Sequence, residues 1–523
     1  MIGLLKLLGD RPFEVLIVTA FVYYASVAIH RLYFSNIAKF PGPKLAALTY
    51  FYEFYHDFVT PYRFSFKIKE LHEQYGPIIR ISPTELHVSD PSFIDTLYSG
   101  GNKKRDKYWM ATQNLNLRES AFGTVPHDLH RVRRGALNRF FSKGSVAKLE
   151  PTIVHLLNKF CARLEENAGT DQPIVFDSAI SCFTTDVVSL YAFGIDTKLL
   201  DVKDFRNDVR ITLEGGLKSS RVTKQWPWVG KFLESLPESW TVRMAPEFAE
   251  YFKLQNNAVE SIKQVEKEVA EGKRPETDMG TTIFHELMDS DLPAFEKSVD
   301  RLWQEGQSVI GAGTETVTWT LAVIFYHVLT KPRIMQKLMD EVLPIFPNAD
   351  EIPSQASLER LQYLTAVIYE GLRLSYGLVT RLPRVSPVEP MVFRSTDGKV
   401  EKVIPPGVAV GMSSLIIHHD KGVWGEDADE FVPERWLNEN GQKRRDLDAY
   451  LLSFSKGTRM CLGLQLGYSE LYLALPTVLR RFEGRLELFE TDITDIEVQA
   501  DIVVPRPKLD SKGVRVLVKP KAN

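Results

Sequence analysis

Cys461 lies in a glycine-bearing loop whose residue types suit a thiolate that binds a metal. It is one of only three cysteines in 523 residues. Gly457 and Gly463 flank it and permit positive-φ turns and the close approach of a flat ligand to the sulfur. Arg459 can offer a fork of donors to a carboxylate of that ligand. Residues 467–481 are predicted to form a helix, whose N-terminus would lower the pKa of the thiol. The alternative is a small buried thiol.

A second chemical feature lies within a helix that we predict over residues 298–330. At its middle Ala312-Gly313 precede Glu315-Thr316. A glycine in a helix interior costs about 1 kcal/mol relative to alanine, so some gain should offset it. One explanation is a locally opened turn, which would make room for a small ligand and free the Thr316 hydroxyl to bind it. The other is a close crossing by a second helix.

A third feature is a pair of opposite charges in a helix predicted over residues 361–374. Glu370 and Arg373 lie three residues apart, so they share one helix face and can pair. On an exposed helix such a pair would contribute little to stability. Arg435 follows in an irregular stretch and is a candidate third member.

The loop spacing Phe454-x-x-Gly457-x-Arg459-x-Cys461-x-Gly463 resembles the haem-ligand loop of the cytochrome P450 family of haem-thiolate monooxygenases. The resemblance implies that Cys461 is the axial ligand of the iron of haem b and that the other four residues help to bind this cofactor. A thiolate in this place favours cleavage of the O–O bond of dioxygen.

The helix motif Ala312-Gly313-x-Glu315-Thr316 resembles the acid–alcohol pair of the same family. By resemblance, Ala312 and Gly313 border the cofactor, Thr316 holds the distal oxygen and a water, and Glu315 relays protons from solvent. These two residues are the predicted catalytic pair. They favour a monooxygenase over two alternatives: a haem-thiolate isomerase or dehydratase that does not use O2, and a non-catalytic haem-binding membrane protein.

Other parts of the resemblance concern residues around the cofactor. Glu370, Arg373 and Arg435 match the family's Glu-x-x-Arg motif and its later arginine, which implies a buried structural charge set. Arg134 and Arg381 are the expected partners of the haem propionates. His130 stands where the family usually carries Trp, and residues 378–380 would face substrate.

The N-terminal segment predicts a membrane anchor. Residues 13–29 are nearly all apolar, and the stretch is about long enough to span a bilayer. A cleavable signal peptide and a buried soluble helix are the alternatives. Two prolines around Gly42 then predict a stiff hinge. We therefore expect an anchor over residues 1–34, a hinge over 35–50 and one catalytic domain over 51–523.

Composition limits the remaining choices. The chain has 44% hydrophobic and 25% charged residues, which is typical of a globular protein with a sizeable core. A formal net charge of −3 gives no reason to expect a nucleic-acid partner. Three cysteines are too few for a disulfide framework, which favours a reducing compartment. Short β-branched runs predict hairpins at residues 78–88 and 404–419.

The resemblance implies a mainly α fold with a small β-rich part, the cytochrome P450 fold, preceded by an N-terminal transmembrane helix. The expected reaction inserts one oxygen atom of O2 into an apolar small molecule. No flavin- or nicotinamide-binding segment is recognisable in the sequence, so the electrons of NADPH would come from a separate reductase. The resemblance extends to fungal members that make secondary metabolites such as terpenoids or polyketides, trichodiene oxygenase among them. It implies the endoplasmic reticulum membrane, with the catalytic domain facing the cytosol.

Overall fold

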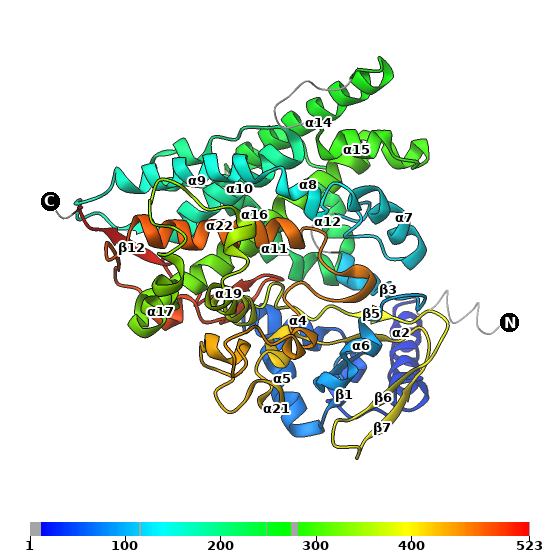
Figure 1. Ribbon diagram of the computed structural model, residues 1–523. Coiled ribbons are helices and arrows are strands. Elements are labelled where there is room, and N and C mark those ends of the chain that lie inside the picture. The colour runs from blue at the N-terminus through cyan, green and yellow to red at the C-terminus, as the bar shows by residue number, and fades with distance from the viewer. Residues whose placement is uncertain (1–11, 114–116, 247, 274–280, 522–523) are drawn as a thin grey trace.

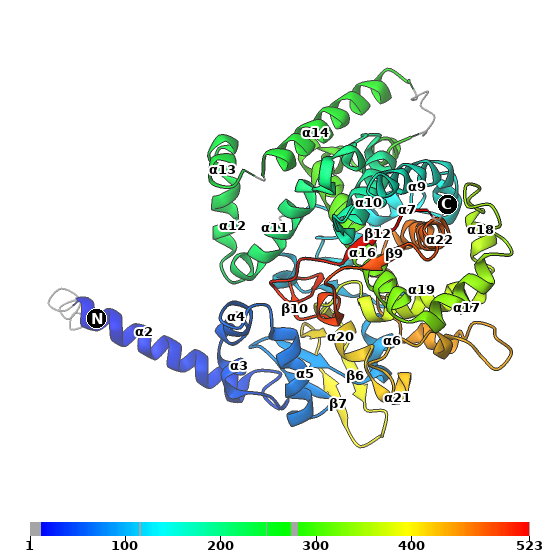
Figure 2. The ribbon, with the colours of Figure 1, turned by 90° about the vertical axis from the view of Figure 1, so that its left-hand side faces the viewer.

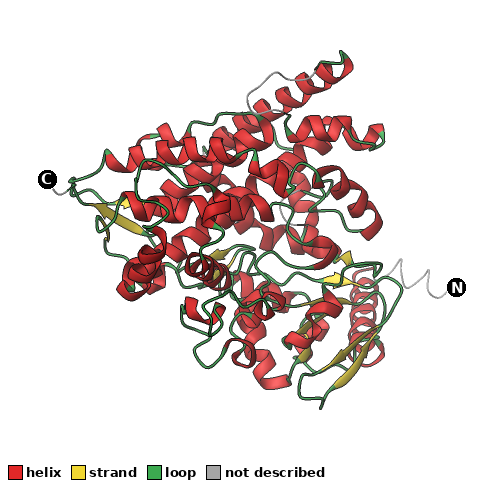
Figure 3. Ribbon diagram, viewed as in Figure 1, coloured by secondary structure: helices red, strands yellow, loops and turns green. Residues whose placement is uncertain are grey.

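The computed structural model describes residues 12–113, 117–246, 248–273 and 281–521 (Figure 1). Helices make up most of this part, and the strands form small sheets at its edges (Figure 3). The helices are α2 Pro12–Ile29, α3 Lys44–Leu48, α4 Phe51–Phe58, α5 Phe64–Tyr75, α6 Ile94–Leu97, α7 His127–Asn138, α8 Lys143–Ala147, α9 Glu150–Glu165, α10 Phe176–Phe193, α11 Asp208–Gln225, α12 Pro227–Glu234, α13 Glu238–Met244, α14 Phe248–Ala270, α15 Ile283–Asp289, α16 Val299–Thr330, α17 Pro332–Val342, α18 Gln355–Leu358, α19 Gln362–Ser375, α20 Ser414–Ile417, α21 Lys421–Trp424 and α22 Leu464–Arg481.

Helix α16 runs through the middle of the body and packs against α10, α14, α19 and α22 (Figure 1). Its C-terminal half is almost entirely buried, in keeping with the apolar residues around its whole circumference. The helix ends before Pro332, because the residue before a proline is pushed out of the helical region; Lys331 has φ −118° and ψ 85°. α16 is thus the central helix of the body.

The largest sheet has the strand order β1-β2-β8-β5-β3, and β2 and β8 are parallel. The predicted hairpin at residues 78–88 is confirmed, because β1 and β2 pair antiparallel with Ile78 opposite Val88. The hairpin predicted at residues 404–419 is wrong, since the stretch after β8 forms α20. The strands of this sheet are β1 Ile78–Arg80, β2 Glu85–Val88, β8 Ala409–Gly411, β5 Arg384–Val385 and β3 Asp106–Lys107.

Three smaller sheets complete the described part of the chain. Pair β6–β7 extends the lower edge of the body in Figure 1, and β10–β11 forms a hairpin near the C-terminus whose turn packs with Tyr62 and Leu217. Their bounds are β6 Met391–Arg394, β7 Glu401–Ile404, β10 Ala500–Asp501 and β11 Pro505–Arg506, and the third sheet contains β4 Ile174–Val175, β12 Arg515–Val518 and β9 Leu486–Leu488.

Helix α2 projects from the body as an isolated rod (Figure 2). Residues 13–34 are long and apolar enough to cross a membrane, and none of that stretch is buried in the protein. α16 passes the same test of length and composition but is mostly buried, as expected of a core helix. At the hinge, a Cβ on Gly42 would lie 2.3 Å from the carbonyl oxygen of Arg80, so only glycine fits there.

Candidate functional site

The Cys461 loop is closed by its own backbone and by the helix that follows. The N–H of Cys461 donates to the carbonyl of Phe454 at 2.8 Å, and the Phe454 ring packs 5.1 Å from that of Tyr468 on α22. α22 begins at Leu464, three residues earlier than predicted, which brings its N-terminus closer to the sulfur. The loop is therefore a rigid turn that presents one side chain.

Two glycines of this loop have different roles. Gly457 has φ 70°, and a Cβ there would lie 2.3 Å from the carbonyl oxygen of Tyr98, so the loop packs tightly on residues 98–99. Gly463 has an ordinary φ of −83°, and a Cβ would meet none of the described atoms within 4 Å. The positive φ expected of Gly463 is therefore not found.

The Cys461 thiol is accessible, unlike those of Cys161 and Cys182, which are buried. The packed loop around it still removes water and raises the pKa of the thiol, while the N–H of Gly463 and the guanidinium of Arg134 act in the opposite direction. Arg134 is held beside the loop because its Nη1 donates to the carbonyl oxygen of Met460. A cation and a backbone N–H thus both favour the thiolate form.

A cluster of unpaired basic side chains surrounds the approach to this loop. None of its members forms an ion pair with a carboxylate of the described residues, and loss of water lowers the pKa of each of them. The pKa of Arg459 falls to about 9 and that of His130 to about 2, with the neighbouring cations as the next cause. The cluster consists of Arg105, Lys107, His130, Arg134, Arg384 and Arg459.

Strand pairing brings two of these cations face to face. Lys107 on β3 lies opposite Arg384 on β5, and like charges in direct cross-strand register destabilise a sheet. Arg459 uses Nε, Nη1 and Nη2 to donate to backbone carbonyls of residues 105, 124 and 125, so it is positioned without being neutralised. The Nε of Arg105 is buried and has no partner. The positive charge of this cluster would be neutralised by an anionic ligand.

Arg381 does not belong to this cluster, which corrects our expectation for it. Its Nε lies 2.7 Å from a carboxylate oxygen of Glu85, and its Nη2 lies 2.8 Å from one of Glu53. Two buried carboxylates already occupy its guanidinium, so it has no free charge to offer a propionate. Arg384 has no such carboxylate partner among the described residues and belongs to the cluster. Both arginines lie in the same short stretch before β8, so sequence alone does not tell which of them is paired.

The centre of α16 is an unbroken helix. Thr316 donates through Oγ1 to the carbonyl oxygen of Ala312 at 2.8 Å, one turn earlier. The locally opened turn is therefore not observed. Ala312 is exposed and Thr316 is half-buried, whereas the next turns of the helix are buried. These two side chains thus lie on an accessible stretch in the middle of a core helix.

Gly313 serves a different purpose from the one we expected. A Cβ at this position would lie 2.7 Å from Cγ2 of Val188 on α10, so the glycine allows α10 to cross closely. The hydroxyls of Thr185 and Thr314 join the two helices at 3.0 Å. The close-crossing explanation therefore holds for Gly313, and its role in cofactor binding stays a prediction.

Glu315 points away from solvent into a charge network. Its Oε1 lies 2.9 Å from Nε of Arg210 on α11, and its Oε2 lies 2.7 Å from Nη2 of Arg506 on β11. Burial raises the pKa of this carboxyl, but the two arginines outweigh it and hold the pKa below its ordinary value. Glu315 is therefore ionised and held at both oxygens.

Glu370 bridges Arg373 and Arg435, the two arginines predicted to pair with it. Arg373 binds both of its oxygens, at 2.7 and 2.9 Å, and Nε of Arg435 lies 3.0 Å from Oε1. Trp436 Nε1 and the backbone N–H of Val432 also donate to the carboxylate. Every oxygen lone pair of this fully buried group has a donor, as a buried charge requires.

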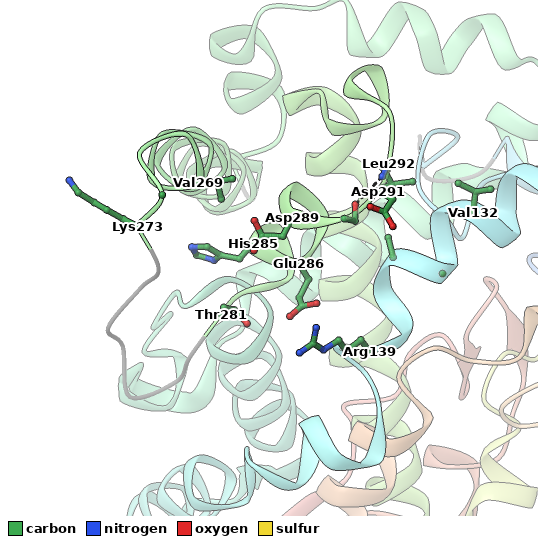
Figure 4. A pocket seen from close by; sticks show the side chains of 14 residues that line it. Val132, Arg139, Val269, Lys273, Thr281, His285, Glu286, Asp289, Asp291 and Leu292 are labelled. Carbon is green, nitrogen blue, oxygen red and sulfur yellow. Dashed lines mark hydrogen bonds between the residues drawn. The ribbon is translucent and has the colours of Figure 1, made fainter.

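A surface pocket of about 1010 Å³ lies elsewhere, between α7, α15 and the end of α14 (Figure 4). Arg139, His285 and Glu286 point toward it, together with Asp289 and Leu292. None of the predicted catalytic or cofactor-binding residues lines it. It is a solvated groove rather than the site of the chemistry.

Comparison with known proteins settles the family. The Cytochrome P450 family model matches residues 53–512. The chain belongs to the cytochrome P450 family. It is 41% identical over 515 residues, 96% of each chain, to a cytochrome P450 monooxygenase of Cochliobolus heterostrophus. It is 40% identical to a tryptophan 6-hydroxylase of Fusarium equiseti over 98% of each chain, and 36% identical to an N-acetyltryptophan 6-hydroxylase of Emericella nidulans over 99% of each.

This cytochrome P450 is an oxygen-incorporating oxidoreductase that uses haem with a thiolate ligand. The residues present fit that group. An accessible thiol with donors that favour its anion suits the iron, and the unpaired cationic cluster suits the two propionates. The prediction of the fold, mainly helical with small sheets, is confirmed.

Proposed function

We propose that this cytochrome P450 hydroxylates or epoxidises an apolar small molecule in fungal secondary metabolism. The observation that carries the proposal is the exposed Cys461 beside a cationic cluster that forms no ion pair with a carboxylate in the described part of the chain. Terpenoids and polyketides are the first substrate classes to screen. Aromatic amino acids are the next, because two of the relatives are named for hydroxylating tryptophan and its N-acetyl derivative.

Haem b would be held at its iron by Cys461 and at its propionates by Arg134, Arg384 and Arg459. When bound, it supplies the reductive activation of dioxygen. Phe454 and Gly457 keep the loop in the shape that presents the sulfur. Gly463 and Ala312 leave space for a flat group, because one lacks a side chain and the other carries only a methyl group.

Glu315 and Thr316 of α16 would transfer protons to the reacting oxygen. Thr316 Oγ1 can release its bond to Ala312 and donate to an oxygen or a water beside it, since that bond is internal to the helix. Glu315, the residue before it, can take up a proton and pass it on. The two side chains thereby deliver protons to one place.

Replacing Thr316 by Ala tests this role. We expect hydrogen peroxide to account for most of the NADPH consumed, and product per NADPH to fall about 10-fold or more, because positioned proton transfer contributes about 10²–10⁴-fold to such steps. Hydrogen peroxide, oxidised product and NADPH consumption are measured in one assay reconstituted with a separate reductase.

Thr318→Ala is the matched control for this variant. Thr318 also donates to the carbonyl one turn earlier, at 2.7 Å, but it is buried against Thr184 on α10. We expect normal coupling with some loss of stability. Unchanged coupling in Thr316→Ala, or equal uncoupling in both variants, would contradict the role given to Thr316.

A second pair of variants separates Arg384 from Arg381. Arg384→Gln should retain several-fold less haem per chain at unchanged fold stability, because it removes a cation that no carboxylate of the described residues neutralises. Arg381→Gln should instead lower the free energy of unfolding by about 3–5 kcal/mol, since it leaves Glu85 buried without its cation and Glu53 with Lys224 alone. Haem content and urea unfolding measure the two effects. The assignment fails if Arg381→Gln loses haem while Arg384→Gln keeps it.

We further propose that α2 anchors the protein in the endoplasmic reticulum membrane, with the body in the cytosol beside the reductase. Support comes from the isolated apolar rod of α2 and from exposed Trp228, Phe232 and Trp240 on α12 and α13, which lie on the side of the body from which α2 projects (Figure 2). Retention of the full chain in microsomes after alkaline carbonate extraction checks the anchor. Release into the supernatant would contradict it.

A further inference from the structure

The two arginines that hold Glu315 are bound in different ways. Arg210 uses Nε for Glu315, at 2.9 Å, and a separate nitrogen, Nη1, for Asp177 at 3.0 Å. It satisfies both carboxylates at once. Its own N-terminal turn is fixed as well, because the Asn207 side chain accepts from its backbone N–H. These contacts hold Arg210 on Glu315.

Arg506 divides one nitrogen between two carboxylates. Its Nη2 lies 2.7 Å from Oε2 of Glu315 and 3.2 Å from Oε2 of Glu214 on α11. Among the described residues, Nη1 reaches only the carbonyl oxygen of Pro505, and the buried Nε has no partner. A small movement toward Glu214 would exchange one ion pair for another of the same kind. Arg506 is thus poised between two acceptors.

Glu214 is suited to receive the arginine. Burial raises the pKa of its carboxyl, but Arg506 and Lys218 outweigh this and hold the pKa at about 2, so the group stays ionised at neutral pH. Its side chain is one quarter exposed, and Lys218, 2.7 Å away, is more exposed still. The charges of Asp177, Arg210, Glu315, Arg506, Glu214 and Lys218 sum to zero, and the chain of pairs runs from the buried acid to solvent.

We propose that Arg506 is a mobile positioning residue that exchanges between Glu315 and Glu214, and that this exchange frees one oxygen of Glu315 to carry a proton. A carboxylate with both oxygens in ion pairs has no free site for one. After the exchange, a hydronium ion gives one proton to Oε2 and becomes water; the neutral carboxyl then releases that proton toward Thr316 and becomes a carboxylate again. No electrons move in this step. The inference rests on the proposed role of Glu315 as the acid.

Glu214→Gln is the decisive variant, because it removes the second acceptor and leaves Arg506 on Glu315. We expect product per NADPH to fall several-fold and the share of peroxide to rise. Lys218→Gln is the matched control: it takes away the other partner of Glu214 but leaves that carboxylate ready for Arg506, so coupling should stay normal. Normal coupling in Glu214→Gln, or equal loss in both variants, would overturn the proposal.

Infrared titration of the intact protein gives a readout that does not depend on turnover. The carboxyl band of Glu315 is identified by its absence in Glu315→Gln. Arg506→Gln should raise the pKa of Glu315 by about 1–3 units, the usual effect of losing an adjacent opposite charge. Arg506→Lys keeps that charge and should leave the pKa close to its value in the unchanged protein. Glu214→Gln should shift it downward. The charge of Glu214 also raises the pKa of Glu315 directly, so Glu214→Gln is repeated in the Arg506→Gln protein. The exchange predicts a much smaller downward shift there, and an equal shift in both backgrounds would contradict it.

These measurements also separate the inference from the proposal beneath it. If Glu315→Gln itself couples normally, the acid role of Glu315 fails and the exchange fails with it. If Glu315→Gln uncouples the enzyme while Glu214→Gln does not, Glu315 remains the acid and only the exchange is overturned.

Discussion

Glu370→Gln is expected to lower the free energy of unfolding by about 3–5 kcal/mol, because it removes the charge that compensates two buried arginines. Arg373 is fully buried and would keep its positive charge with only carbonyl oxygens around it, those of residues 418, 428 and 430. Gln cannot accept at both oxygen positions, so Trp436 or Arg435 would also lose an acceptor. Urea unfolding of the purified variant, together with its soluble yield, measures the loss.

Glu434→Gln is the matched control for this prediction. Glu434 lies one residue before Arg435 and pairs with Lys337 at 2.6 Å, but both side chains are about 40% exposed. We expect a change of less than about 1 kcal/mol, as for other exposed ion pairs. If Glu370→Gln were no more costly than Glu434→Gln, the buried charge set would not hold the fold.

The same charge set predicts how stability depends on pH. Burial raises the pKa of the Glu370 carboxyl, but Arg373 and Arg435 outweigh it, so the pKa in the folded protein is below the ordinary 4.5. A group with a lowered folded pKa stabilises the protein fully above its unfolded pKa, and this contribution is lost as the pH falls through the folded pKa. The Glu370 contribution should therefore stay constant above about pH 5.5 and decline only in acid.

Much of this architecture follows from local sequence pattern. The long helix α16 is bounded by Ser298 and Pro332, and the hairpin β1–β2 shows in its β-branched alternation. The Cys461 loop could be recognised from the spacing of its own residues, Gly457 among them. These patterns act within a few residues, so they are visible in sequence. The close contact of Gly457 with the carbonyls of residues 98–99 joins distant segments and is not visible there.

The partners of the site residues were harder to predict, because they come from distant segments. Arg381 is neutralised by Glu53 and Glu85, each about 300 residues earlier, and no local pattern links them. The alternative of a close helix crossing was correct for Gly313, but only the position of Val188 decides it. Likewise, nothing near Glu315 in sequence indicates that Arg506 holds it. Tertiary contacts decide which charge is free and which is paired.

The central claim is that Cys461 binds haem iron as a thiolate, and the reduced, carbon monoxide-bound spectrum tests it most directly. We expect a strongly red-shifted Soret band in the full chain and its complete loss in Cys461→Ser, because a serine oxygen does not supply the electron density of a thiolate. Cys161→Ser, a buried thiol away from the loop, should keep the band. A red-shifted band that survives in Cys461→Ser, or a haem-loaded full chain that never shows it, would contradict the account.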